Sequence, residues 1–236
     1  MFYDLHIHSC LSPCGDMDMT PYNLVNMSAL NGIEVIALTD HNTSKNCPAA
    51  MKAGEEAGVL VIPGMELTTA EEAHIVCLFD DVDKALAFSD YVYEKLPDVK
   101  NKSEVFGQQI IMDHEDRALG SLDKLLITAT TISVMDVERI VKEHDGFCFP
   151  AHIDRNSYSI ISSLGDIPPE CGFITAEISK SGDDLALMDT HPILKDMRIV
   201  HSSDAHYLTD LADPIHKLNV SEATAKAVIE SLKIKK

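Results

Sequence analysis

The 236-residue chain contains no tryptophan, and it has only 19 lysines and arginines against 38 aspartates and glutamates. The formal net charge of −19 repels phosphate backbones over long range, so we do not expect strong binding of long nucleic acids. No apolar run approaches the roughly 20 residues that a membrane helix needs. Asp4 and His6 also interrupt any signal-peptide core near the N-terminus. We therefore expect no membrane partner.

Two further absences narrow the class of protein. Six cysteines lie scattered through a chain of ordinary size, which indicates reduced thiols and a cytoplasmic protein, not a disulfide framework. No glycine-rich loop of the dinucleotide-binding or phosphate-binding kind follows a predicted strand. The sequence leaves the oligomeric state open.

Apolar runs and helix signals alternate along the chain. Strands are predicted at 2–7, 33–40, 59–67, 74–79, 147–152, 173–179 and 197–204, and helices at about 21–31, 47–57, 83–96, 134–145, 157–163, 182–189 and 222–234. Thr20, Ser133 and Ser221 are the predicted N-caps of three of these helices. Repeated strand–helix units predict an α/β fold with a parallel sheet, closed into a barrel, in a single domain of residues 1–236. The stretch 98–130 contains no predicted strand, and we expect it to be an insertion of helices and loops over the site.

Histidines and carboxylates gather at the predicted strand ends. They are His6 and His8, Asp40 and His41, Glu66, His74 at the start of its strand, His152, and Asp204 with His206. Functional sites of parallel α/β sheets collect at one such edge, and strand residues two apart point the same way. So many nitrogen and oxygen ligands exceed the needs of one tetrahedral ion. They predict two or three divalent ions (Zn, Mn or Fe), with a carboxylate that bridges them. Asp40 is expected to orient His41 or to cap a helix, and the histidines given an ordinary structural role are His114, His144, His191, His201 and His216.

Five segments carry a specific resemblance to a known family. They are DLHIHS, ALTDHN, PGMELTT with the downstream HIVCLF, PAHIDR, and SSDAH, in this order between residues 4 and 206. Together they resemble the polymerase-and-histidinol-phosphatase (PHP) domain family. The resemblance implies a distorted TIM-like (β/α)7 barrel, two or three metal ions, and hydrolysis of phosphoesters.

The resemblance also implies how the ligands are shared. One ion would be held by His6, His8, Glu66 and Asp204, a second by Glu66, His74 and His152, and a third by His41, His206 and one residue of the first loop. Family members often have HTxxSDG in that loop, whereas this chain has HSCLSPCGDM, which is about three residues longer. Counting back from the Thr20–Pro21 helix start favours Asp16, which we expect to be the ligand. Counting forward from His8 favours Cys14, whose thiolate would bias the ion towards zinc.

The expected reaction follows from these charges. Water shared by two cations loses a proton near neutral pH, and the metal-bridging hydroxide would attack phosphorus. Arg155 resembles the arginine of the family's AHPxR motif and is expected to bind a phosphate oxygen, with Lys180 as a lesser candidate. Asp204 or His206 is expected to assist the leaving group.

The expected substrate is a small phosphomonoester or a nucleotide. The insertion is expected to select it, with Phe106, Gln108 and Gln109 as candidate contacts to a base or sugar. The alternatives are an end-directed exonuclease acting on short RNA or DNA, a non-catalytic PHP scaffold domain, and a related hydrolase that attacks a C–N bond.

Overall fold

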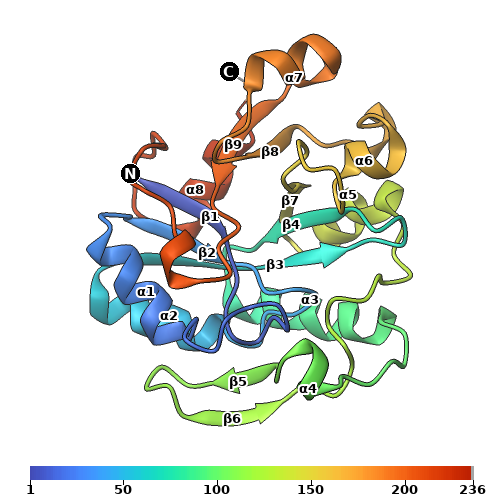
Figure 1. Cartoon of the computed structure of the whole chain (residues 1–236). Coiled ribbons are helices and arrows are strands. Elements are labelled where there is room, and N and C mark those ends of the chain that lie inside the picture. The colour runs from blue at the N-terminus through green and yellow to red at the C-terminus, as the bar shows by residue number, and fades with distance from the viewer. Residues whose placement is uncertain (235–236) are drawn as a thin grey trace.

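The computed structural model describes residues 1–234 and contains a curled, mixed β-sheet with helices packed outside it (Figure 1). The main sheet has the order β1 (Tyr3–Ile7), β2 (Val35–Leu38), β3 (Leu60–Thr68), β4 (His74–Leu78) and β7 (Phe147–Pro150). A separate parallel pair, β8 (Thr175–Ser179) and β9 (Arg198–Ser202), lies between the two edges of this sheet. Two backbone contacts connect the pair to the sheet. The Ile7–Ala205 bridge joins it to the β1 edge, and the hydrogen bond from Ile153 N to Glu177 O joins it to the chain just after β7. The α/β class is confirmed, but a continuous, closed (β/α)7 barrel is not.

The prediction that all main strands run parallel is wrong for β4. Only residues 69–73 separate β3 from β4, which is too short a link for a crossover helix, and the two strands form an antiparallel hairpin. In this hairpin His74 lies opposite Thr68. The start of β4 therefore lies at the same edge of the sheet as the carboxyl ends of β1, β2 and β3. His74 reaches that edge although it begins its strand.

The helices follow the predicted order with some changes of boundary. They are α1 (Pro21–Leu30), α2 (Cys47–Ala57), α3 (Val82–Lys95), α4 (Ser103–Phe106), α5 (Val134–Glu143), α6 (Ile160–Leu164), α7 (Asp184–Thr190) and α8 (Ala225–Leu232), with 3₁₀ turns at Pro169–Cys171, Pro192–Asp196 and Leu208–Asp210. The hydroxyls of Thr20 and Ser133 accept hydrogen bonds from Asn23 N and Met135 N, so both predicted N-caps are confirmed. The predicted cap at Ser221 is wrong, because Thr224 accepts from Ala227 N and α8 begins there. In residues 1–234 we find no helix with the length and apolar character to cross a membrane.

The insertion contains a β-hairpin that the sequence did not predict, β5 (Ile110–Met112) and β6 (Ala118–Ser121). The hairpin packs below α2 and the first loop of the chain, through hydrogen bonds from Met112 N to Asn46 Oδ1 and from Ile110 N to Cys10 O (Figure 1). Gln109 is fully buried, and its side chain donates to the carbonyls of Leu122 and Lys124. It therefore has a structural role and is not available to a substrate.

The core lies on both faces of the sheet. One apolar cluster packs β2 and β3 against α1 and α2 and includes Ile36, Val61 and Leu24. Another fills the space between the strands and α8 and includes Leu5, Phe149 and Leu232. Because the strands are largely apolar on both faces, the few polar residues within them, such as His6 and Glu177, are buried.

Candidate metal centre

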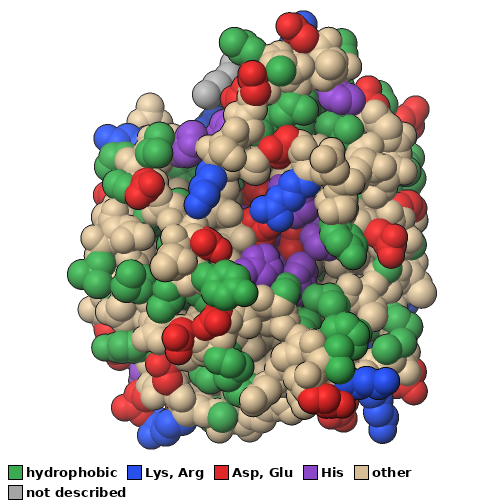
Figure 2. Space-filling model, in the orientation of Figure 1, with side chains coloured by type: hydrophobic (Ala, Val, Ile, Leu, Met, Phe, Trp, Pro, Cys, Tyr) green, Lys and Arg blue, Asp and Glu red, His purple; other side chains and the backbone are tan. Residues whose placement is uncertain are grey.

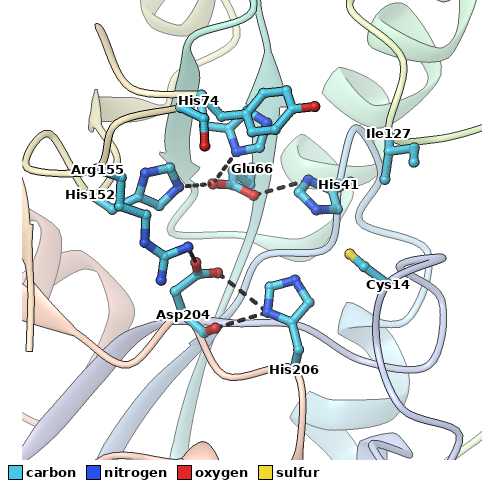
Figure 3. A pocket seen from close by; sticks show the side chains of 11 residues that line it. Cys14, His41, Glu66, His74, Ile127, His152, Arg155, Asp204 and His206 are labelled. Atoms are coloured by element: carbon cyan, nitrogen blue, oxygen red, sulfur yellow. Dashed lines mark hydrogen bonds and ion pairs between the residues drawn. The ribbon is translucent and has the colours of Figure 1, made fainter. Parts of the chain in front are cut away.

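Histidines and carboxylates from distant parts of the chain line one pocket at the carboxyl-terminal edge of the sheet. Figure 2 shows the hollow on this face, where histidine and acidic side chains gather, and Figure 3 shows its lining in detail. The lining residues are Cys14, His41, Glu66, His74, Ile127, His152, Arg155, Ser157, Tyr158, Asp204 and His206. His6 and His8 lie directly beneath them and are fully buried. The structure therefore brings most of the strand-end residues together at one pocket, and Asp40 is not among the residues that line it.

Glu66, at the end of β3, is the centre of the cluster. Its Oε1 lies 2.9 Å from His74 Nδ1 and 3.0 Å from His152 Nε2, and its Oε2 lies 3.0 Å from His41 Nδ1. Two further imidazoles approach the same carboxylate from β1, with His6 Nε2 at 3.2 Å and His8 Nε2 at 3.4 Å. A carboxylate with two oxygens that face different histidines is suited to bridge two ions.

Asp204, just after β9, is the second carboxylate of the cluster. Its Oδ1 lies 3.0 Å from His8 Nε2 and 3.4 Å from His6 Nε2, and its Oδ2 lies 2.5 Å from Arg155 Nη1. Asp204 and His152 both have positive φ, at 51° and 28°. Non-glycine residues rarely adopt this conformation, and such strain concentrates at functional sites. The strained backbone turns both side chains towards the pocket.

Several buried side-chain atoms of the cluster lack a hydrogen bond of acceptable geometry within the described residues, namely Glu66 Oε2, Asp204 Oδ1, His41 Nδ1 and His152 Nδ1. An unpaired buried polar atom is costly, so such a group needs another partner. The Nε2 atoms of His6 and His8 lie 3.1 Å apart. Two nitrogens that bind the same tetrahedral zinc ion, each at about 2.1 Å from it, lie about 3.4 Å apart. The donor set therefore fits divalent metal ions.

Burial and the attraction between neighbours both shift pKa values in the cluster. Burial lowers the pKa values of His6, His8 and His41, but negatively charged neighbours outweigh it and raise all three, so these rings would release a proton on binding an ion. Burial raises the pKa of Glu66, but the surrounding imidazoles, which include His74 and His6, outweigh it and hold that pKa well below its ordinary value. Burial lowers the pKa of His74 to about 4, against the attraction of Glu66. At neutral pH Glu66 is therefore ionised and His74 is neutral. These are the protonation states in which a carboxylate and an imidazole bind a metal ion.

A second layer of polar groups orients the first two histidines. His6 Nδ1 donates to Glu177 Oε1 at 2.9 Å, and His8 Nδ1 donates to Ser12 Oγ at 2.9 Å, which in turn donates to Asp40 Oδ1 at 2.7 Å. Because Nδ1 of each ring faces this second layer, Nε2 is the atom that would bind an ion. Asp40 thus acts through Ser12 and the first loop, and the expectation that it orients the His41 ring is wrong.

Glu177 is the most important residue that the sequence interpretation missed. It is fully buried on β8, and Oε1 also accepts a hydrogen bond from His152 N at 3.0 Å. The available signal was a carboxylate inside the apolar run FITAEIS, because a buried charge in a strand needs a partner. Glu177 therefore links the β1 histidine to the loop that carries His152.

Three groups of side chains are close enough to hold an ion together. They are His6, His8, Glu66 and Asp204; His41, Glu66 and His74; and His8, His41 and His206, with the ligand atoms of each group within 4.8 Å of one another. None of His114, His144, His191, His201 and His216 lines the pocket.

The first loop contributes Cys14 to the pocket lining, and Asp16 is not among the lining residues. The Asp16 carboxylate instead accepts a hydrogen bond from Asp18 N at 2.8 Å, on the exposed side of the loop. We preferred Asp16 to Cys14 because of its distance along the chain from the helix start, and the position of Asp16 in the structure does not support that preference. A turn at Met17 and Asp18 takes up residues between Asp16 and the helix, so the distance along the chain from the helix start did not locate the pocket residue.

The two basic side chains that were candidates for binding a phosphate, Arg155 and Lys180, differ in position. Arg155 lines the pocket and pairs with Asp204. Lys180 does not line it, and its ammonium group donates to Asp210 O. From the insertion only Ile127 is among the lining residues, so Phe106 and Gln108 lie outside the pocket.

Comparison with known proteins identifies relatives for part of the chain. The model of the PHP domain family matches residues 4–155, which is more than half of the 236 residues. An uncharacterized protein from Methanocaldococcus jannaschii is 37% identical over 94 residues, which cover 36% of this chain and 54% of that protein. A 5'-3' exoribonuclease from Haemophilus influenzae is 39% identical over 79 residues, which cover 32% of this chain and 28% of the enzyme. The matched regions thus span about half or less of these relatives.

Solved structures share the fold at low sequence identity. A lesion-specific endonuclease from Pyrococcus furiosus aligns with a TM-score of 0.65 and 18% identity over 98% of this chain and 55% of that chain. A candidate metal-dependent phosphoesterase from Bifidobacterium adolescentis aligns with a TM-score of 0.62 and 18% identity over 86% of this chain and 87% of that chain. Nucleases among these proteins are at odds with the expectation of small substrates alone. The family model ends at residue 155, before Glu177, Asp204 and His206.

Proposed function

This chain belongs to the PHP domain family, and from that membership we propose that it is a metal-dependent phosphoesterase. We propose that it acts on the phosphate group of a nucleotide or of the end of a short oligonucleotide. The observation that carries the proposal is the convergence of two buried carboxylates, Glu66 and Asp204, with the imidazoles of the strand ends on one pocket. A scaffold without catalysis has no need to bury two carboxylates among imidazoles at the floor of an open pocket.

The ions would be shared as follows. His6, His8, Glu66 and Asp204 would hold one ion, Glu66, His74 and His152 a second, and His41 with His206 a third. When bound, such divalent ions lower the pKa of water towards about 7 and neutralise charge that develops on phosphate oxygens. Either effect needs an open ligand position, and the pocket side of the cluster supplies it.

The chain's own residues position the phosphate and handle the leaving group. The Arg155 side chain is 45% exposed and forms an ion pair with Asp204. Its guanidinium can therefore bind a phosphate oxygen while it keeps the contact with Asp204. His206 has a side chain that is 22% exposed, next to Asp204 at the pocket wall, and it would assist the leaving oxygen through the third ion, which its ring nitrogen would hold. These two residues act on the substrate from the same side of the pocket.

The walls of the pocket support a substrate with a planar base. Tyr158 is half-exposed, and its ring stacks on His74 with 5.0 Å between ring centroids and an angle of 21° between the planes. Ile127 adds apolar surface to the same pocket. Aromatic and apolar walls above a phosphate site suit a nucleobase, and the net charge of −19 disfavours a long polyanion.

The proposal is tested by removing and restoring metal ions. Chelation is expected to abolish hydrolysis of nucleoside monophosphates, nucleoside bisphosphates and short single strands, and addition of Mn²⁺ or Zn²⁺ is expected to restore it. Product analysis then separates release of inorganic phosphate from release of a terminal nucleotide. Failure of every phosphoester to react with any of the ions would contradict the proposal. Preference for long duplexes over short ends would contradict the substrate class.

Replacement of Tyr158 by alanine is expected to raise KM for a nucleotide substrate by about 10-fold, because stacking on an aromatic ring contributes about 1–3 kcal/mol per base. The kcat should change little, and the phenylalanine variant should behave like the wild type. A sugar phosphate without a base serves as the control substrate, and its KM should not change. An equal rise for both substrates, or loss of bound metal in the alanine variant, would show that Tyr158 supports His74 instead of the base.

A further inference from the structure

Cys14 is an exposed cysteine that faces the metal centre. It lines the pocket with His41 and His206, and its sulfur faces both imidazoles (Figure 3). The other five cysteines are buried. Cys10, in the same loop, packs its sulfur against that of Met112 and lies outside the pocket lining. Only one thiol of the chain is thus available to an ion in this pocket.

The loop that carries Cys14 is held in place by its backbone. Gly15 N donates to Ser12 O at 2.9 Å, and Asp16 N donates to His206 O at 2.9 Å. A Cβ atom at Gly15 would lie only 2.3 Å from Ser9 O, so the turn requires glycine there. The hydrogen bond from Asp16 ties the loop to the residue that would share the ion, and it leaves the Asp16 carboxylate on the outer side.

The insertion supports the same loop from below. Gly107 has a φ of 99°, and a Cβ atom there would lie 2.4 Å from Pro13 O. This close contact places the insertion directly beneath the residue before Cys14. A shift of the loop that brought Asp16 into the pocket would break both this packing and the hydrogen bond to His206. The geometry therefore favours the thiol over the carboxylate as the loop's contribution to the centre.

We propose that Cys14 supplies a thiolate ligand to the ion held by His41 and His206, which makes this one position a sulfur-containing, zinc-selective site. His8, His41 and His206 form a nitrogen group without a carboxylate, so the thiolate would provide its negative charge. Thiolate ligands favour Zn²⁺, whereas carboxylate–imidazole sets also accept Mn²⁺ or Fe²⁺. Because His8 would hold the first ion, this ion would have three protein ligands, Cys14, His41 and His206, which leaves a fourth position open to the substrate. This inference rests on the metal centre of the proposed function.

The test uses Co²⁺ in place of the bound metal ions. A thiolate bound to Co²⁺ gives a charge-transfer absorption band in the near ultraviolet, which imidazole and carboxylate ligands do not give. We expect this band in the wild type and in the control variant Cys10→Ala, and its loss in Cys14→Ser. Metal analysis should show that Cys14→Ser loses zinc by one equivalent per chain while the other ions stay bound. In Cys14→Asp the selectivity of this position is expected to shift from Zn²⁺ towards Mn²⁺.

A second measurement does not depend on cobalt. In metal-free protein an alkylating reagent should modify Cys14, as read by peptide mass, and bound Zn²⁺ should protect it. The band persisting in Cys14→Ser, or its absence from a wild type that binds Co²⁺ and hydrolyses phosphoesters, would overturn the role of Cys14 and leave the proposed function intact. Loss of one equivalent of metal in Asp16→Asn but not in Cys14→Ser would likewise overturn it. A protein that binds no metal at all would instead refute the proposed function.

Discussion

Replacement of Glu66 by glutamine is expected to lower kcat/KM for a phosphoester by about 10³-fold or more and to release at least one bound metal ion per chain. Glu66 is the only carboxylate in the described structure that lies within 3.4 Å of His6, His8, His41, His74 and His152. Its amide counterpart has a similar shape but no negative charge, so it cannot bridge two cations. Metal analysis and steady-state kinetics on the same preparation measure both effects.

The matched control is Glu56→Gln, an exposed position on α2, which should retain wild-type metal content and turnover. Thermal unfolding with and without metal should accompany the measurement, because removal of a buried charge also changes the stability of the metal-free protein. In the wild type, added metal should raise Tm by mass action, and in Glu66→Gln this rise should shrink. Wild-type turnover in Glu66→Gln would refute the bridging role.

Replacement of Arg155 by alanine is expected to lower kcat/KM by about 10²–10³-fold while the bound metal stays in place. The guanidinium is 45% exposed and pairs with the outer oxygen of Asp204, so it can contact the substrate without being buried with the ligands. Lysine at this position keeps the charge but loses the planar, bidentate geometry, and it should recover only part of the activity. Kinetics combined with metal analysis tests these expectations.

Arg139→Ala is the control for Arg155, because Arg139 is an exposed arginine on α5 whose described ion pairs are with Asp136 and Glu143 only. It should leave the activity unchanged. The ion pair with Asp204 allows a second outcome for Arg155→Ala. If this variant loses metal in proportion to its activity, Arg155 holds Asp204 in position and does not act on the phosphate.

The convergence of the candidate ligands could be largely predicted, because it follows from two properties of a chain that forms β-strands. Side chains two residues apart point the same way, which placed His6 and His8 together, and strand ends meet at one edge, which brought Glu66 and Asp204 to them. The start of β4 joined the same edge only through an antiparallel hairpin. His74 was therefore placed correctly within a sheet whose predicted direction was wrong.

The structure of the insertion, and the buried polar residues that orient His6 and His8, could not be predicted in the same way. The β5–β6 hairpin is short, and β6 is exposed along its length, so its apolar pattern is too weak to predict a strand. Glu177 has no neighbour along the chain that reveals its partner, because His6 lies 171 positions away. Such pairs depend on how the sheet curls, which local patterns do not encode.

The sequence by itself determined the α/β class, the strand ends that carry ligands, and the donor chemistry suited to divalent ions, because these depend on residue type and on periodicity along the chain. Only the tertiary structure decided that the curled sheet is not hydrogen-bonded continuously into a closed barrel. It also decided that Glu66 lies at the centre of the imidazoles, and that Cys14 faces the pocket while Asp16 does not. Those features depend on contacts between residues far apart in the chain. In the first loop the deciding contact is the hydrogen bond from Asp16 N to His206 O.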